Sequence, residues 1–320
     1  MFLCIFRQIC YLCIKETTED ASMESISLRG MGVALITPFD SDKKIDFRAL
    51  ERMIEYLIAG NVDYLVVLGT TGETVTLSRE ERILVRRFTI DKVGGRVPLI
   101  VGFGGNNTQE LVEELKEADL SGFSAILSVA PFYNKPSQEG IYQHYKAIIE
   151  ASPLPVILYN IPGRTGVNIS AETTLRLANE FPQLIGIKEA SGNFKQIETI
   201  INHRPDNFYV ISGDDSLTYP LMTLGADGVI SVVGNAFPVQ FGNMVRLCLN
   251  GNFKEALPIH YNFTRLYDEL FVDGNPAGIK SLLHDMGMIE NELRLPLVPT
   301  RFETSEELRK ILNELSAYRN

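Results

Sequence analysis

The chain has 320 residues, of which 45% are hydrophobic and 22% are charged, and its formal net charge is −10. These values are typical of a soluble globular protein with a large core, built as one large domain or two small ones. The acidic balance and the lack of a basic cluster exclude nucleic acid as an expected partner, and no apolar stretch reaches the ~18–20 residues that cross a membrane.

Residues 1–22 differ in character from the rest of the chain. Met1 to Ile14 resembles a weak signal peptide, but Arg7 interrupts its apolar run and no small-residue cleavage site comes after it. We therefore expect 1–22 to be a disordered tail, or to lie upstream of a true start at Met23. A cytoplasmic location is predicted.

Three of the four cysteines crowd this segment, at Cys4, Cys10 and Cys13, whereas Cys248 stands alone on a predicted helix. Cys10 and Cys13 have the spacing of half a zinc site. No second ligand pair occurs at metal spacing, and the four histidines are scattered. The sequence therefore predicts no metal.

Eight short apolar runs occupy the next part of the chain, and each is predicted to be a strand. Their hydrophobicity is continuous and does not alternate, which is typical of strands that are buried on both faces. The runs begin near Gly32, Tyr64, Pro98, Ser124, Pro155, Leu184, Phe208 and Gly228.

Amphipathic helical patterns lie between these runs. Apolar residues recur at helical spacing from Phe47 to Ile58, and Ser78 with Glu81 forms a capping box at the start of another helix. Eight strand–helix units favour a (β/α)8 TIM barrel over an open doubly wound sheet. No Gly-x-Gly-x-x-Gly pattern comes after the first run, which also argues against a dinucleotide-binding fold.

The barrel is placed at residues 23–235, and 236–320 are expected to form a C-terminal helical extension. No low-complexity linker separates the two regions. The predicted helices of the extension span 238–248, 253–270, 278–286 and 305–318.

Lys188 is the most informative residue, because it lies in a run that otherwise reads as a buried strand, Leu184 to Ala190. Apolar surroundings disfavour the charged form of a lysine, so its amine becomes available as a nucleophile. Tyr159 ends the preceding predicted strand. Side chains at the C-terminal ends of barrel strands face one site, so the pair indicates Schiff-base chemistry with proton transfer.

Other strand ends also carry polar groups. Gly69 to Glu73 contains Thr70 and Thr71, and such a turn either binds a carboxylate through its hydroxyls and backbone amides or is an ordinary capped turn. Arg164, in a loop rich in Pro and Gly, is either a bidentate carboxylate ligand or a solvated arginine.

The fourth run ends in Ala130 to Pro136, where the aromatic pair Phe132 and Tyr133 between prolines is commonly just loop packing. Two further segments also carry candidate residues. Asp214 and Asp215 are adjacent carboxylates that suggest a metal, but Asp215 is better interpreted as the N-cap of the helix that starts at Ser216. Gly213 precedes them, and Ile230 in the last run is placed to lie beside Lys188.

Taken together, these segments resemble the dihydrodipicolinate synthase family, within the lysine-aldolase superfamily of pyruvate-binding barrels. The similarity extends from about Gly32 to Pro299. The motifs that carry it are Gly-Thr-Thr-Gly-Glu at 69–73, Pro-Phe-Tyr-Asn-Lys-Pro-Ser-Gln-Glu-Gly at 131–140, Tyr-Asn-Ile-Pro-Gly-Arg-Thr-Gly at 159–166, Gly-Ile-Lys-Glu-Ala-Ser-Gly at 186–192 and Asn-Pro at 275–276.

The resemblance implies a reaction of lysine and diaminopimelate biosynthesis. Lys188 would form an imine with pyruvate, and the derived enamine would attack L-aspartate 4-semialdehyde to give 4-hydroxy-tetrahydrodipicolinate. No metal or organic cofactor would be required. The implied proton relay is Thr70, Tyr159 and Tyr133, with Tyr133 donated by a neighbouring subunit of a homotetramer that is a dimer of dimers.

The resemblance also implies the residues that bind the substrates. Thr71 matches the contact to the pyruvate carboxylate, and Arg164 matches the contact to the carboxylate of the semialdehyde. Gly213 and Ile230 complete the predicted substrate-binding set.

Some family members are inhibited by lysine at a subunit interface, and the matching positions here are Thr74, Val75, Arg79, Arg82, Asn106, Glu110 and Phe132. Asn106 and Glu110 fit the family pattern. Arg79 and Arg82 depart from it and would repel the ammonium of lysine, and Phe132 lacks the hydroxyl of the usual tyrosine. Weak or absent inhibition by lysine is therefore predicted.

Two alternatives remain open. Another pyruvate-dependent aldolase, such as N-acetylneuraminate lyase or a keto-deoxy-sugar acid aldolase, would share Lys188 and Tyr159. The Thr70–Thr71 pair and Arg164 favour the synthase. A non-catalytic pyruvate-binding protein is the second alternative, and the intact set of polar residues argues against it.

Overall fold

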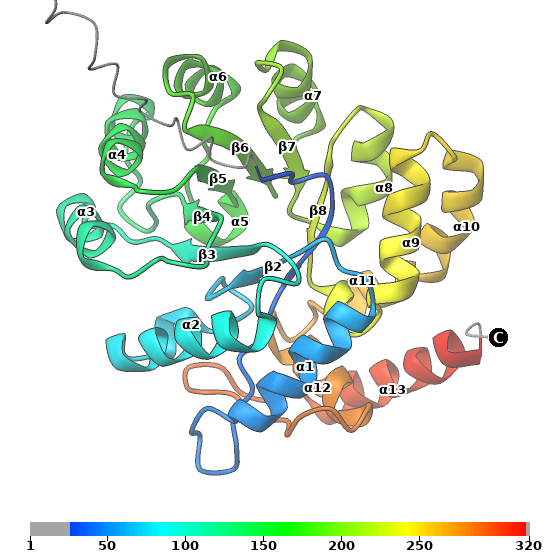
Figure 1. The fold of residues 1–320 in the computed structure, drawn as a ribbon. Coiled ribbons are helices and arrows are strands. Elements are labelled where there is room, and N and C mark those ends of the chain that lie inside the picture. Colours follow the sequence, from blue (N-terminus) through cyan, green and yellow to red (C-terminus); the bar gives the residue numbers. More distant parts are fainter. Residues whose placement is uncertain (1–25, 318–320) are drawn as a thin grey trace, which may run out of the picture.

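The computed structural model describes residues 26–317, and these form a closed barrel of eight parallel strands in the order β1 to β8, with β8 paired to β1 (Figure 1). The predicted (β/α)8 barrel is confirmed. The strands are β1 Gly30–Ala34, β2 Tyr64–Val67, β3 Leu99–Phe103, β4 Ala125–Val129, β5 Val156–Asn160, β6 Leu184–Glu189, β7 Tyr209–Ser212 and β8 Gly228–Ser231.

Helices alternate with the strands and form the outer layer. The short 3-10 helices are η1 Thr74–Thr76 and η2 Val233–Asn235. The α-helices are α1 Phe47–Ala59, α2 Arg79–Val93, α3 Thr108–Glu117, α4 Gln138–Ala151, α5 Pro162–Thr165, α6 Ala171–Glu180, α7 Phe194–His203, α8 Asp215–Thr223, α9 Pro238–Leu249, α10 Phe253–Asn262, α11 Thr264–Glu269, α12 Ala277–Asp285 and α13 Phe302–Ala317.

The predicted helix starts have a local cause in side-chain caps. The Ser78 hydroxyl accepts from the Glu81 amide at 3.2 Å, and the Glu81 carboxylate accepts from the Ser78 amide at 2.9 Å. This reciprocal capping box satisfies two amides that the first turn of α2 leaves without helical partners.

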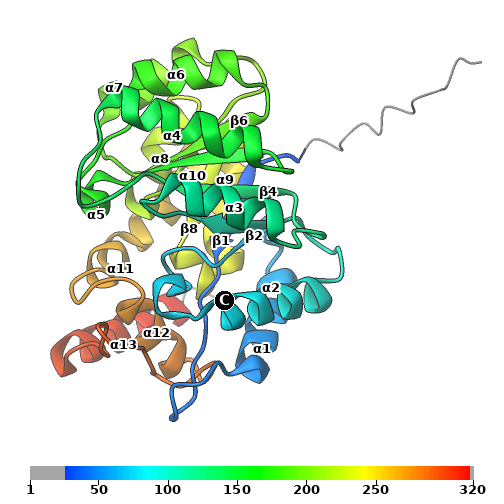
Figure 2. The ribbon, with the colours of Figure 1, turned by 90° about the vertical axis from the view of Figure 1, so that its left-hand side faces the viewer.

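Helix α9 packs against β1 and β8, so it completes the ring of helices around the barrel. The described residues after α9, 250–317, are here called the C-terminal region. Figure 2 shows α11, α12 and α13 gathered at one side of the molecule, away from α6 and α7. The predicted single helix from Phe253 to Leu270 is wrong, because the chain forms α10 and α11 with a break at Phe263.

The helix start after β7 also differs from the prediction, because Asp214 and not Asp215 is the N-cap of α8. The Asp214 carboxylate accepts from the Ser216 amide at 2.9 Å. Asp215 is the first helical residue, and its carboxylate accepts from the amides of Val232 and Val233, both at 2.9 Å. The second carboxylate therefore ties the start of α8 to the segment after β8.

The barrel interior is filled by its own apolar cluster, separate from the larger core between strands and helices. Tyr64 is fully buried, and its ring occupies the space where a side chain at Gly32 would lie. Tyr159, Ile211 and Ile230 belong to the same interior cluster. The barrel is thus a packed core, and polar groups can act only where the strands end.

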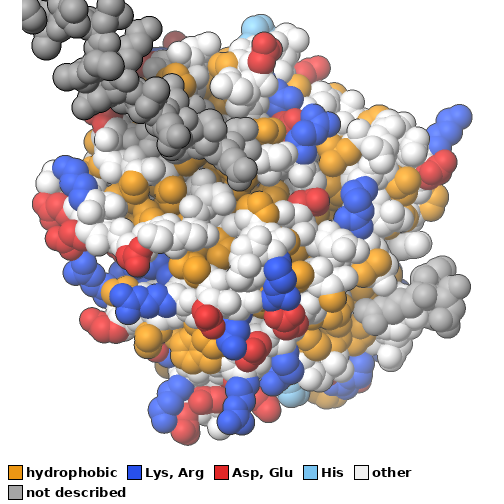
Figure 3. All heavy atoms as spheres, in the orientation of Figure 1, with side chains coloured by type: hydrophobic (Ala, Val, Ile, Leu, Met, Phe, Trp, Pro, Cys, Tyr) orange, Lys and Arg blue, Asp and Glu red, His pale blue; other side chains and the backbone are white. Residues whose placement is uncertain are grey.

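Positive and negative side chains are intermixed over the face in Figure 3. Between residues 26 and 317 no helix is both long and apolar enough to span a bilayer. Cys248 lies buried on α9, as predicted for its helix, and burial raises the pKa of its thiol to about 11. The predictions made for 1–22, including the pair Cys10 and Cys13, fall outside the described residues.

Candidate active site

Lys188 and Tyr159 lie side by side in the barrel wall. The register of β5 and β6 pairs Tyr159 with Lys188, and both side chains are buried, with exposures of 6% and 5%. The Lys188 Nζ lies 4.3 Å from the centroid of the Tyr159 ring. The structure therefore brings together the two residues that the sequence singled out, with the amine over the face of the aromatic ring.

A polar network backs this pair on the outer face of the sheet, because successive strand residues point to opposite faces. The next residues along β5 and β6 are Asn160 and Glu189. The Asn160 side-chain amide donates a hydrogen bond to the Glu189 carboxylate at 2.6 Å, and Gln196 donates to the same carboxylate at 2.8 Å. Burial raises the pKa of Glu189, and the donors oppose that increase. The network fixes the strand register that aligns Lys188 with Tyr159.

This network was not predicted from the sequence. The sequence did contain a signal for it, namely an asparagine and a glutamate at the last positions of two apolar strands. Because buried polar groups need hydrogen-bond partners, these two residues could have been expected to pair.

Gly213, just after β7, provides the space for the lysine side chain. A Cβ atom at this position would lie 3.0 Å from Lys188 Cε and 2.8 Å from the Ala190 Cβ. Ile211 of β7 pairs with Lys188 in the sheet register. Gly213 thus contacts the lysine directly, and Ile230 lies buried in β8 within the interior cluster that also contains Tyr159.

The segment Gly69–Glu73, here called the threonine turn, lies just after β2. Thr71 is buried, and its hydroxyl accepts from the Asn275 side-chain amide at 2.9 Å. Thr70 is half-buried. The turn begins after Leu68 with φ 59° and ends at Glu73 with φ 51°. Two non-glycine residues in the left-handed region carry backbone strain, which is concentrated at functional sites in proteins.

Tyr133 lies on the loop after β4, and Arg164 lies in the short helix α5 that comes after β5. The Tyr133 amide donates to the Thr165 carbonyl at 3.2 Å, so the loop and α5 are tied together. Tyr133 has φ 72°, and its side chain is 88% exposed. Arg164 is exposed in α5, and its Nη2 reaches the carbonyl of Asn275 at 3.5 Å.

Asn275 is therefore common to two predicted substrate contacts. Its side chain donates to Thr71, and its carbonyl accepts from Arg164. Its Oδ1 is buried without a hydrogen-bond partner. In the sequence this residue was visible only as part of a motif, because no local pattern indicates a contact across the barrel mouth.

The positions of the predicted lysine site lie on η1, α2, α3 and the loops after β3 and β4. Asn106 exchanges two hydrogen bonds with the backbone of Phe132, at 2.6 and 2.8 Å. Arg79 pairs with Glu117 at 2.9 Å, and the Nε of Arg82 is buried without a partner. Val75 is 84% exposed. Within the described residues, the chain by itself joins Asn106 to Phe132 but shows no contact that unites the whole set.

The described residues contain no group of three or more His, Cys, Asp or Glu side chains arranged to hold a metal ion. The candidate residues at the strand ends and in the segments after them supply an amine, a phenol, hydroxyls, an amide and a guanidinium. Such a set suits covalent amine chemistry on a substrate that carries carboxylates.

Comparison with known proteins agrees with this geometry. The model of the dihydrodipicolinate synthetase family matches residues 27–315. A 4-hydroxy-tetrahydrodipicolinate synthase from Phocaeicola vulgatus is 60% identical over 288 residues, which cover 90% of this chain and 97% of that protein.

Two solved structures show the same fold. The chloride-inhibited dihydrodipicolinate synthase from Acinetobacter baumannii, complexed with pyruvate, has a TM-score of 0.88 at 41% identity and covers 91% of this chain and 99% of that one. The enzyme from Cyanidioschyzon merolae with lysine bound has a TM-score of 0.87 at 37% identity, with coverage of 90% and 98%. The family match spans nearly all of the described residues, and the predicted family is confirmed: the chain belongs to the dihydrodipicolinate synthetase family.

Proposed function

We propose that the chain has 4-hydroxy-tetrahydrodipicolinate synthase activity and carries it out through an imine on Lys188. The activity follows from family membership and from relatives of that name that match over nearly the whole chain. The observation that supports the role of Lys188 is its contact with Tyr159 in a buried site that Gly213 keeps open.

The chemistry begins at the amine. The neutral Nζ of Lys188 adds to the keto carbon of pyruvate, and loss of water leaves a protonated imine. Loss of a proton from the methyl carbon gives an enamine, which forms a carbon–carbon bond to the aldehyde carbon of L-aspartate 4-semialdehyde. The amino group of that substrate then attacks the imine carbon, so that the ring closes and Lys188 is released. The imine replaces an external cofactor.

The two carboxylates of the substrates have separate contacts. Thr71 receives the pyruvate carboxylate, and Arg164 receives the carboxylate of the semialdehyde, for which a planar guanidinium is well suited. Asn275 supports this assignment because it is bonded to both residues. A shared partner sets the spacing between the two carboxylate contacts. Ile230 supplies an apolar wall.

Thr70, Tyr159 and Tyr133 form the proton relay, since hydroxyl groups pass protons without bringing a net charge into the site. Tyr133 is 88% exposed in the single chain. A proton-relay hydroxyl must act in a site that excludes water, and Tyr133 in the single chain is largely in water. Its exposure therefore supports the proposal that the Tyr133 side chain inserts into the site of a neighbouring subunit. We propose a homotetramer, a dimer of dimers, with the dimer as the smallest active unit.

We propose that the protein acts in the cytoplasm. We also propose that lysine inhibits it weakly or not at all. Phe132 offers no hydroxyl to an effector, and the Asn106 side chain is already bonded to the Phe132 backbone. Arg79 and Arg82 add positive charge where an ammonium would enter.

The test is a coupled assay with pyruvate and L-aspartate 4-semialdehyde on the wild type and on Lys188→Ala. The wild type should turn over, and borohydride with pyruvate should attach an adduct to Lys188 that is absent from the variant. Turnover of N-acetylneuraminate in place of the semialdehyde would assign the chain to the other aldolases. An adduct without any turnover would indicate a binding protein.

A further inference from the structure

A buried ion pair connects the threonine turn to the C-terminal region. Lys280 of α12 donates to Glu73, the last residue of the turn, and the exposure of both side chains is 0%. The Lys280 ammonium also donates to the Glu292 carbonyl at 3.0 Å and lies 4.1 Å from the centroid of the Phe39 ring. Burial lowers the pKa of Lys280, and the Glu73 carboxylate opposes that decrease.

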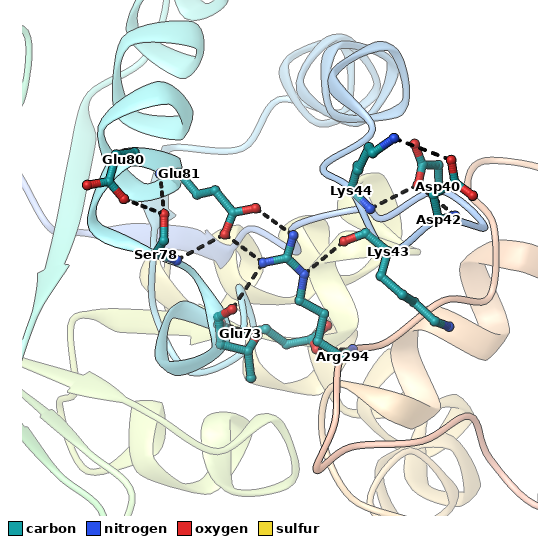
Figure 4. A network of polar contacts seen from close by, with 10 residues as sticks. Asp40, Asp42, Lys43, Lys44, Glu73, Ser78, Glu80, Glu81 and Arg294 are labelled. Atoms are coloured by element: carbon teal, nitrogen blue, oxygen red, sulfur yellow. Dashed lines mark hydrogen bonds and ion pairs between the residues drawn. The ribbon is translucent and has the colours of Figure 1, made fainter.

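The second oxygen of Glu73 is held from the same region. The Arg294 amide donates to it at 3.2 Å. The Arg294 guanidinium donates twice to Glu81 of α2 at 2.6 Å (Figure 4) and once to the Thr76 carbonyl of η1 at 3.0 Å. Its Nε donates to the Lys43 carbonyl at 2.9 Å. Both carboxylate oxygens of Glu73 therefore have fixed directions.

A third contact from the C-terminal region reaches the middle of the turn, where Asn275 donates to Thr71. On its other side, the Thr37 hydroxyl donates to the Gly72 carbonyl at 2.7 Å. The turn is thus held at Thr71 and Glu73 by residues more than two hundred positions later in the chain. Without such contacts, the left-handed Glu73 would relax toward an unstrained conformation.

Stability alone does not account for this arrangement. An apolar pair of similar volume is often as stable as a buried ion pair or more so, because two charges must be taken out of water. Ion pairs and charge-assisted hydrogen bonds have a direction, however, and they place a backbone more closely than apolar contacts do.

We propose that Lys280 is a positioning residue for catalysis: through Glu73 it holds Thr70 and Thr71 in their reactive geometry. The C-terminal helical region is then part of the catalytic apparatus, although none of its helices comes directly after a barrel strand. The inference rests on the roles proposed above for Thr70 and Thr71. Displacement of the whole turn should affect both the binding of pyruvate and the subsequent proton transfer.

The experiment compares Lys280→Met, Glu73→Gln and the double variant with the wild type. The assays are kcat and KM for pyruvate at saturating semialdehyde, at a temperature where circular dichroism shows every variant folded, together with Tm. Arg204→Met is the matched control, because it removes a partly buried ion pair to Asp227 at the opposite end of the barrel.

Lys280→Met should lower Tm, since it leaves a buried carboxylate unpaired, and should lower kcat/KM for pyruvate by about 10- to 100-fold, the loss expected from a displacement approaching 1 Å. The double variant has no unpaired charge, so Tm should recover, but kcat/KM should stay at least threefold below the wild type. In Lys280→Met and in the double variant, both kcat and KM for pyruvate should differ from the wild-type values. Arg204→Met should lower Tm only.

A folded double variant with kcat/KM within threefold of the wild type would overturn the inference. Thr71→Val separates that result from a failure of the proposed function. If Thr71→Val also has wild-type kinetics, the role of the turn itself is wrong. If Thr71→Val is impaired and the double variant is not, only the role of the ion pair is wrong.

Discussion

Replacement of Gly213 by alanine tests the central geometry of the site. The added Cβ would lie 2.8 Å from the Ala190 Cβ, 3.0 Å from Lys188 Cε and 3.1 Å from its Cγ. Because carbon atoms in contact prefer separations of about 3.5–4.0 Å, the side chains of Lys188 and Ala190 must move away from the added atom by about 0.5–1 Å. Gly213 does not have a positive φ, so alanine is compatible with the backbone and the effect is steric.

A displacement of this size should lower kcat/KM for pyruvate by about 10- to 100-fold. The rate of borohydride trapping of the pyruvate imine should fall in parallel, because the displaced amine is the attacking group. Gly105→Ala is the control, since the atom nearest to a Cβ there belongs to Leu111 and lies at 3.7 Å, an ordinary contact distance. If folded Gly213→Ala forms the imine and turns over within twofold of the wild type, the proposed position of Lys188 during the reaction is incorrect.

Three further predictions concern the relay, the second substrate and a buried acid. Tyr133→Phe should lower kcat about 100-fold or more while the dimer persists in ultracentrifugation, and unchanged turnover would exclude Tyr133 from the relay. Arg164→Lys should raise KM for the semialdehyde at least tenfold while pyruvate trapping stays normal, and an equal loss of trapping would refute a contact specific to the second substrate. Burial raises the pKa of Asp215 to about 6, so the stability contributed by its protonated form is present below the unfolded pKa and is lost as pH rises through the folded pKa. The unfolding free energy of Asp215→Asn relative to the wild type should therefore increase by about 2 kcal/mol from pH 4 to pH 7. Chemical denaturation at the two pH values measures this increase, and its absence would contradict a raised pKa of Asp215.

The strands and the pair of Lys188 and Tyr159 were predictable because they depend on local sequence patterns. A strand buried on both faces is continuously apolar, so Lys188 and Tyr159 were visible as exceptions at the strand ends. The barrel rule then placed those ends at one mouth. Capping residues fixed helix starts in the same local way, as at Ser78.

Other features depend on distant partners and were not predictable. Either of the adjacent residues Asp214 and Asp215 has the chemistry of an N-cap, and only the amides after β8 decide which one is used. The break at Phe263 between α10 and α11 occurs within an apolar stretch that also suits one helix. Asn275 and Lys280 act across the fold, so no spacing along the sequence indicates their partners.

The pair of Lys280 and Glu73 has a consequence for protein synthesis. Its two members are 207 residues apart, and a ribosome that adds about 5–20 residues per second needs about 10–40 s to make the intervening chain. During that interval Lys280 is not available to pair with Glu73. Because an unpaired carboxylate is costly to bury, we expect that of Glu73 to stay in water and the turn not to reach its final form. If Lys280 positions the turn as proposed, a nascent chain that has completed every barrel strand is expected to stay inactive until α12 leaves the exit tunnel.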